Sequence, residues 1–332
     1  MNRWLEPLNY DPLRPLVSSG IEPVAYFARR DLLDEDVGPA SVLWDSPAVR
    51  RIVRRQRPDG SWPPPGHSRP IFPKRHHDLI ETWRALSLLT DGYGFNREHP
   101  SARAAAEFIL TFQTEEGDIR GFLANQHATY YTGAVLATLI MAGYGDDPRI
   151  AKGLEWLLSM RQDDGGWSIP ILTHRFDRGT MQRLTTRYAE PIEPDRSKPS
   201  SHNWTDMALR AFAAHPAYRR SAESCASAES LKASFFKPDY YSSLRAASHW
   251  VRFLFWWPNQ LTALESLSTM GYSGDDPDIR RALDWFAGAQ EPGGLWKTTY
   301  EPGKKEAMNE RTTERRLWLT LRICRTFRAL CR

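Results

Sequence analysis

The sequence predicts an all-α fold in which about six helix pairs close head to tail into an α/α toroid. Two observations carry this prediction. A motif of one helix and one glycine-rich turn recurs along the chain, and the helical segments between its copies are apolar around most of their circumference. Because repeated units pack only on their neighbours, one domain can be long. We therefore expect a single domain over residues 1–332.

The motif is clearest in two copies that keep a constant offset, from Asp146 to Trp167 and from Asp275 to Trp296. Each begins with Asp-Asp-Pro, which suits a helix N-cap followed by proline in the first turn, and ends in a glycine-rich turn closed by tryptophan. A third copy starts at Pro100 and a fourth ends at Trp62. These copies predict the outer helices of the pairs.

Helices that are apolar on many sides usually lie inside a fold. The inner helices are predicted over 76–89, 130–142, 203–214 and 261–270, with 21–34 and 309–330 completing the set. The segment 168–201 breaks the pattern with proline, arginine and threonine, and its length indicates either a functional loop such as a lid or a disordered surface insertion.

The copies resemble the QW repeats of the terpenoid cyclase and prenyltransferase superfamily, in which an aromatic residue precedes Gln and then Gly-x-Trp. Gln56, Gln113 and Gln290 occupy the Gln position, and Arg161 occupies it in the remaining copy. The resemblance covers most of the chain from 49 to 296 and implies the α/α toroid fold. It further implies an isoprenoid or similarly apolar substrate held in the toroid cavity.

Squalene–hopene cyclases, which the chain resembles, start their reaction by protonating an alkene with the middle Asp of a DxDD-T-A motif. The nearest match is the segment 203–208, Asn-Trp-Thr-Asp-Met-Ala, where Asp206 matches the last Asp and Thr205 occupies the place of the acid. A threonine hydroxyl is not a strong general acid. The zinc ligands of the related protein prenyltransferases include a cysteine, and no cysteine stands at an inner-helix start.

The N-termini of the inner helices would gather at one mouth of a toroid, so polar residues distant in sequence could meet there. The candidate catalytic residues are Asp206, Asp78, His202, His77 and His127. A carboxylic acid in an apolar cavity can stay protonated near neutral pH, so Asp206 is the predicted acid, tuned by His202 or His77. The alternative is that Asp206 only complements the dipole of its helix.

Aromatic faces near such a cavity could stabilise a carbocation, or could simply form core. The candidate substrate-binding residues are Trp204, Tyr130, Tyr131, Trp256, Trp257, Asn203, Gln260 and Trp83. No cofactor is expected. The alternative is Zn²⁺ or Fe²⁺ bound by His77, His127 and His202, because imidazoles with a nearby carboxylate suit these ions.

The predicted function is a cyclisation or isomerisation of an apolar substrate by protonation. Two alternatives stay open: a non-catalytic toroid that binds a lipid, peptide or partner protein, and a metal-dependent hydrolase or lyase that uses the histidines at the mouth.

Composition limits the partners and the compartment. The 44 basic and 40 acidic residues are interspersed, so no nucleic-acid partner is expected, and the arginine runs at 50–57 and 311–328 are interpreted as solvated faces. Three unpaired cysteines favour a reducing cytoplasm, and no apolar run could span a membrane. Phe235, Phe236 and Lys237 with Tyr240 and Tyr241 suggest peripheral membrane contact.

Overall fold

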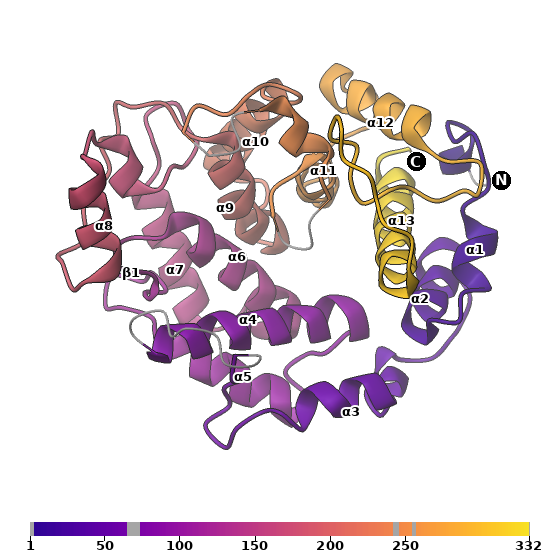
Figure 1. Cartoon of the computed structure of the whole chain (residues 1–332), viewed down its shortest axis with the longest axis horizontal. Helices are drawn as coiled ribbons and strands as arrows, with labels where there is room; N and C mark the ends of the chain where they lie inside the picture. Colours follow the sequence, from indigo (N-terminus) through magenta and orange to yellow (C-terminus); the bar gives the residue numbers. More distant parts are fainter. Residues whose placement is uncertain (1–2, 65–73, 242–245, 254–256, 332) are drawn as a thin grey trace. The chain divides into compact units, whose positions relative to one another are not determined.

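The computed structural model describes residues 3–64, 74–241, 246–253 and 257–331 (Figure 1). Contacts within the chain divide it into two compact units, one of Met1–Gly38 with Ala228–Arg332 and the other of Pro39–Ser227. The expectation of a single domain over 1–332 stays a prediction.

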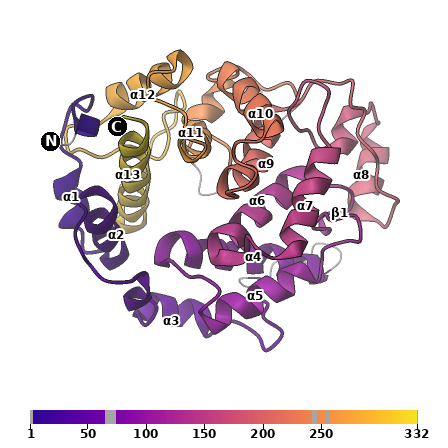
Figure 2. The ribbon, with the colours of Figure 1, turned by 180° about the vertical axis from the view of Figure 1, so that it is seen from behind.

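The unit of residues 39–227 contains most of the helix pairs. Its elements are the short helix η2 (Ala40–Leu43), α3 (Pro47–Val53), α4 (Lys74–Tyr93), α5 (Pro100–Leu110), β1 (Phe122–Asn125), α6 (Thr129–Leu139), the π-helical turn η3 (Ile140–Tyr144), α7 (Pro148–Ser159), η4 (Pro170–Thr173), α8 (Arg178–Thr186) and α9 (His202–Ala214). Figures 1 and 2 both show α4, α6 and α9 as successive neighbours.

The other unit combines both ends of the chain. Its elements are η1 (Arg3–Leu5), α1 (Leu13–Val17), α2 (Glu22–Leu32), the end of α10 (Ala222–Ala233), η5 (Ala247–Val251), α11 (Gln260–Thr269), α12 (Pro277–Ala289) and α13 (Glu310–Leu330). In this unit α13 packs against both α2 and α11.

Two kinds of helix alternate, as the sequence predicts. Nearly every residue of α6 and α9 is buried, whereas α7 buries one face through residues such as Ile150, Leu154 and Leu157. The pair α11 and α12 repeats this contrast. At the crossing of α6 and α9, a Cβ on Gly133 would lie 2.5 Å from the Cα of Ala208, so only glycine allows this approach. The prediction of an all-α fold of helix pairs is confirmed, with β1 as a four-residue exception.

Tryptophan closes the repeat turn by bonding back to its own helix. The indole N–H of Trp62 donates to the carbonyl of Ile52 at 2.8 Å, and that of Trp167 donates to Leu157 at 2.7 Å. Trp296 makes the equivalent bond to a carbonyl of α12. Each ring thus covers the end of the preceding helix while its polar N–H is satisfied, which explains why the distance from helix to tryptophan is fixed.

Glutamine links three of the four repeat turns to the start of a neighbouring helix. The amide of Gln56 donates to the carbonyl of Ser101 in α5 at 2.9 Å, and that of Gln113 donates to Arg149 in α7 at 2.7 Å. Gln290 makes the same kind of bond to the carbonyl of Tyr10, just before α1. A buried amide that bridges two repeats stabilises their stacking, and this gives the repeated Gln its physical role.

The insertion 168–201 contains η4 and α8, and its coil is fastened to the rest of its unit. The side chain of Gln126 donates to the carbonyl of Glu190 at 3.0 Å and accepts from the N–H of Ile192 at 3.0 Å. Helix α8 packs on β1. A disordered insertion would have no such bonds, so that alternative is wrong; movement as a lid stays a prediction.

None of the described helices combines the length and the apolar composition that a bilayer span requires. In the segment proposed to contact a membrane, Tyr240 is 62% exposed, whereas Phe235 is buried against Trp250 with ring centroids 5.5 Å apart. Phe235 is therefore a core residue, and membrane contact by the rest of the segment stays a prediction.

Candidate functional site

Five aromatic rings form one connected cluster in the unit of residues 39–227. They are Trp83 of α4, Phe122 of β1, Tyr130 and Tyr131 of α6, and Trp204 of α9. Tyr131 stacks on Phe122 at 4.2 Å and meets the edge of Trp83 at 5.6 Å. Tyr130 contacts both Tyr131 and Trp204, with ring centroids 4.5 Å and 4.7 Å apart respectively. We call these residues the aromatic cluster.

The aromatic cluster is uncharged, and all its rings except the half-buried Tyr131 are buried. Burial raises the pKa of Tyr130 above its usual range, and the phenolate of Tyr131 would add to the effect. Burial also raises the pKa of Tyr131, although the Arg84 guanidinium opposes it. Both phenols are therefore neutral at physiological pH. The cluster offers ring faces, rather than charges, to whatever contacts it.

Four of the predicted substrate-binding residues belong to the aromatic cluster: Trp83, Tyr130, Tyr131 and Trp204. Asn203 precedes Trp204 on α9 and is buried. Trp257 and Gln260 belong to the other unit, and Trp256 lies outside the described residues. The sequence analysis missed Phe122 because it lies in a four-residue strand, which is too short to show a periodic pattern.

Asp206 is fully buried on α9 and forms an ion pair with Arg210, with Oδ2 and Nη2 2.8 Å apart. Residues four apart lie on the same face of a helix, so His202, Asp206 and Arg210 share one face. Trp204 is two positions from Asp206 and projects from a different face. The predicted acid and its predicted partner His202 are thus on one stripe of α9, beside a permanent positive charge.

Thr205, which the predicted resemblance aligns with the acid of squalene–hopene cyclases, has a structural role. Its Oγ1 accepts the backbone N–H of Trp167 at 2.9 Å. In each of the other three repeat turns, a backbone N–H likewise donates to the hydroxyl of a threonine on an adjacent helix. The pairs are Trp62 with Thr82 at 2.9 Å, Ile119 with Thr132 at 3.2 Å, and Trp296 with Thr320 at 3.3 Å. The hydroxyl therefore belongs to the repeat scaffold, which explains threonine at this position.

Asp78, near the start of α4, forms an ion pair and a backbone hydrogen bond. Its Oδ2 accepts from Nη1 of Arg57 at 2.9 Å, and its carbonyl accepts from the Thr82 hydroxyl. Its neighbour His77 is half-buried. Arg57 belongs to a repeat turn, so this ion pair joins that turn to α4.

A charge cluster surrounds the predicted catalytic residue His127, with Asp118 and His127 buried, Arg120 partly buried and Glu193 exposed. Its members are Asp118 and Arg120 from the turn after α5, His127 before α6, and Glu193 from the insertion. Arg120 donates to both Asp118 oxygens, at 2.6 Å and 3.1 Å. His127 has Nε2 3.2 Å from a Glu193 oxygen and Nδ1 3.7 Å from Asp118. We call these residues the Asp118 cluster.

Hydrogen bonds decide the protonation state of Asp118. Burial alone would raise its pKa, but bonds from His127, Arg120 and Thr114 outweigh burial and hold the pKa at about 2. Asp118 is therefore a carboxylate at all physiological pH values. The sequence analysis missed Asp118 and Arg120, although an Asp-x-Arg pair in a repeat turn that other copies lack was a visible signal.

Glu116, Asp118 and His127 could in principle bind a cation. One ligand atom from each lies within 4.8 Å of the others. This group contains His127 but neither His77 nor His202. Both oxygens of Asp118 already accept bonds from Arg120, and one accepts from Thr114 as well. The guanidinium occupies the place that a metal ion would need, so these residues do not fit a metal as they are arranged.

Sequence comparison relates part of the chain to known cyclases. A squalene–hopene cyclase of Bradyrhizobium diazoefficiens is 32% identical over 131 residues, which cover 36% of this chain and 18% of the relative. A probable squalene–hopene cyclase of Sinorhizobium fredii is 31% identical over 97 residues, which cover 29% of this chain and 15% of the relative. The predicted resemblance to squalene–hopene cyclases is confirmed.

The squalene–hopene cyclase resemblance is confined to less than a fifth of each relative's length. No family model matches the chain. Among solved structures, a protein from Actinoplanes has a TM-score of 0.43 at 17% identity and covers 93% of this chain and 90% of that one. A variant of the type II terpene cyclase MstE from Scytonema, in complex with geranylgeranyl dihydroxybenzoate, has a TM-score of 0.43 at 14% identity, with 99% and 87% covered.

Proposed function

We propose that the chain is a terpenoid cyclase-like enzyme that holds an isoprenoid or similarly apolar chain against the aromatic cluster and cyclises or isomerises it. The observation that carries the proposal is the continuous contact of five rings, four of them buried and Tyr131 half-buried, contributed by α4, β1, α6 and α9. Such faces attract a carbocation by about 1 to 2 kcal/mol each when desolvated. The partial similarity to squalene–hopene cyclases supports the same substrate class.

The proposed proton donor is Asp206. The step requires that Asp206, which is ion-paired with Arg210 in the structure, first takes up a proton from solvent. The Asp206 O–H bond then breaks, the alkene π electrons form a new C–H bond, and positive charge develops on the neighbouring carbon. Arg210, 2.8 Å away, would stabilise the carboxylate that the transfer leaves. The cation would then close a ring with a second alkene, and loss of a proton or capture of water would complete the reaction. Thr205 is not the proposed donor because a threonine hydroxyl is too weak an acid; in the structure its Oγ1 accepts the N–H of Trp167.

The test is incubation with squalene and with shorter isoprenoid alkenes, followed by mass-spectrometric analysis of cyclic products. We expect a product with wild-type protein and a loss of at least about a hundredfold in rate with Asp206→Asn, the usual scale for removing a general acid. Asp275→Asn removes a carboxylate that is 86% exposed and is the control for the loss of one charge. A product formed equally fast by Asp206→Asn would reject Asp206 as the donor.

A non-catalytic protein that binds an apolar ligand is the second candidate, and the scaffold bond of Thr205 favours it. The saturated analogue squalane cannot be protonated, so quenching of tryptophan fluorescence by squalane would report binding alone. Binding of squalane without conversion of any alkene would establish the second candidate. A metal-dependent hydrolase or lyase remains a third proposal, which metal analysis tests. The three free cysteines support a reducing compartment such as the cytoplasm.

A further inference from the structure

The structure separates the two arginine runs of the sequence into different roles. In the C-terminal run, four arginines of α13 form ion pairs: Arg316 with Glu291, Arg322 with Glu265, Arg325 with Asp31, and Arg328 with Asp34. These pairs fasten α13 to its neighbours within one unit, so this half of the run is structural. The prediction of a solvated face is wrong for these four residues.

The run on α3 has no such partners. Arg50, Arg51, Arg54 and Arg55 are exposed, and among the described residues none has a carboxylate within ion-pair distance. No Asp or Glu lies outside the described ranges. Within the described part of the chain, their guanidinium groups make one hydrogen bond, from Arg55 to the carbonyl of Pro63 at 3.4 Å. Four permanent positive charges therefore lie within six residues without compensation.

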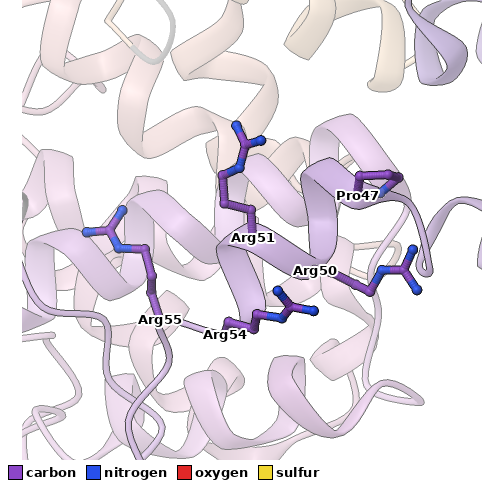
Figure 3. Close-up of a pocket in the computed structure, with 5 residues that line it drawn as sticks. All are labelled: Pro47, Arg50, Arg51, Arg54 and Arg55. Atoms are coloured by element: carbon purple, nitrogen blue, oxygen red, sulfur yellow. The ribbon is translucent and has the colours of Figure 1, made fainter.

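These four arginines surround a hollow. With Pro47 they line an open pocket of about 520 Å³, and Figure 3 shows their guanidinium groups spread apart around it. This volume is in the range of small-ligand sites. Arg50 and Arg54, and likewise Arg51 and Arg55, are four residues apart at the end of α3, so like charges lie on one side of the chain and repel. An anion in the hollow would remove that repulsion.

We propose that this arginine pocket on α3 binds a phosphate-rich anion, such as a diphosphate or polyphosphate group. A guanidinium presents a planar fork of N–H donors that matches two phosphate oxygens, and it stays charged at any physiological pH. Four forks around one hollow suit a ligand with several phosphate oxygens better than a single carboxylate. The pocket is independent of the aromatic cluster and of the proposed cyclase reaction.

The test measures binding of tripolyphosphate by titration calorimetry at low and high salt. We expect saturable binding that weakens as salt rises, and a dissociation constant at least about tenfold higher in Arg50→Gln/Arg54→Gln, the scale of one lost charge-assisted bond. Arg311→Gln/Arg315→Gln is the matched control, because both arginines are exposed and four apart on α13. The control should bind like wild type.

A second arm distinguishes a soluble ligand from a lipid headgroup. Vesicles of phosphatidylcholine with phosphatidic acid, compared with phosphatidylcholine alone, offer the same phosphate chemistry on a surface. Binding of either probe that the α3 variant loses and the α13 variant keeps supports the proposal, and the probe that binds identifies the source. Absence of binding to both probes, or equal loss in the two variants, would overturn it. Circular dichroism of each variant checks that α3 is still folded.

Discussion

At the scale of single residues, Asp118 shows how a buried carboxylate makes the stability of the fold depend on pH. Its pKa is about 2 in the folded protein, below the ordinary value of 3.8. A depressed folded pKa stabilises the native state above the unfolded pKa, and the contribution is lost as the pH falls from about 4 to 2. The shift corresponds to roughly 2 kcal/mol. The loss of stability between about pH 4 and pH 2 should therefore come in part from the Asp118 cluster.

We predict that Asp118→Asn lowers the free energy of unfolding at pH 7 by about 2 kcal/mol or more, because Arg120 then lacks its carboxylate. The difference between wild type and variant should shrink as the pH approaches 2. Urea unfolding at several pH values measures it, with the exposed Asp284→Asn as the charge-matched control. A difference that stays constant from pH 7 to pH 2 would contradict the assignment.

Thr205 provides a test of the hydrogen bond that joins α9 to the Trp167 turn. Thr205→Val keeps the shape of the side chain but leaves the Trp167 N–H without its acceptor. An unsatisfied buried donor costs about 1 to 3 kcal/mol, so we predict destabilisation of that size by thermal or chemical unfolding. Thr313→Val, at an exposed position of α13, should change stability far less. Equal effects of the two substitutions would argue against the scaffold role.

At the scale of the helix and its turn, glycine sets how closely one repeat approaches the next. Gly117 has φ of 119°, and a Cβ there would lie 2.5 Å from the carbonyl oxygen of Lys152 in α7. We predict that Gly117→Ala destabilises the protein by at least about 2 kcal/mol, through backbone strain and displacement of α7. The measurement is the denaturation midpoint.

Gly288→Ala is the matched control, because Gly288 lies in α12 and a Cβ there meets nothing within 4 Å. Alanine favours a helix over glycine by up to about 1 kcal/mol, so this variant should be slightly more stable than wild type. If both substitutions stabilise the protein, the close approach of the Gly117 turn to α7 is not what fixes glycine there.

The elements themselves could be predicted because their signals are local. Proline after Asp or His marked the starts of α5, α7 and α12, and apolar residues around most of the circumference marked α6 and α9. The partners of the polar side chains could not be predicted, because they depend on approach in space. The bonds from Gln56 to Ser101 and from Thr205 to Trp167 join different repeats, and the bonds from Gln126 to the insertion span more than sixty residues.

At the scale of the whole molecule, the sequence grouped candidate residues by their position at helix starts, and the structure groups them by contact. Four predicted aromatics do meet, in the aromatic cluster. The polar candidates divide: Asp206 pairs with Arg210, Asp78 pairs with Arg57, and His127 joins Asp118. Helical periodicity predicts which face of a helix a side chain occupies, but it does not predict which arginine will pair with a given carboxylate. For Asp206, Asp78 and His127, the pairing with an arginine, or with a carboxylate that an arginine binds, sets the local charge.

Bound species should distinguish the three proposed functions in one measurement. Native mass spectrometry with elemental analysis of freshly purified protein is expected to find an apolar ligand of isoprenoid mass and no stoichiometric zinc or iron. The reason for the second expectation is that Arg120 already occupies both oxygens of Asp118. Arg120→Gln removes this competing charge. In this variant, Glu116, Asp118 and His127 could therefore bind added Zn²⁺. Stoichiometric metal in wild-type protein that His127→Ala abolishes would reject the cyclase-like proposal in favour of metal-dependent chemistry, because the guanidinium would then have to leave the site in solution.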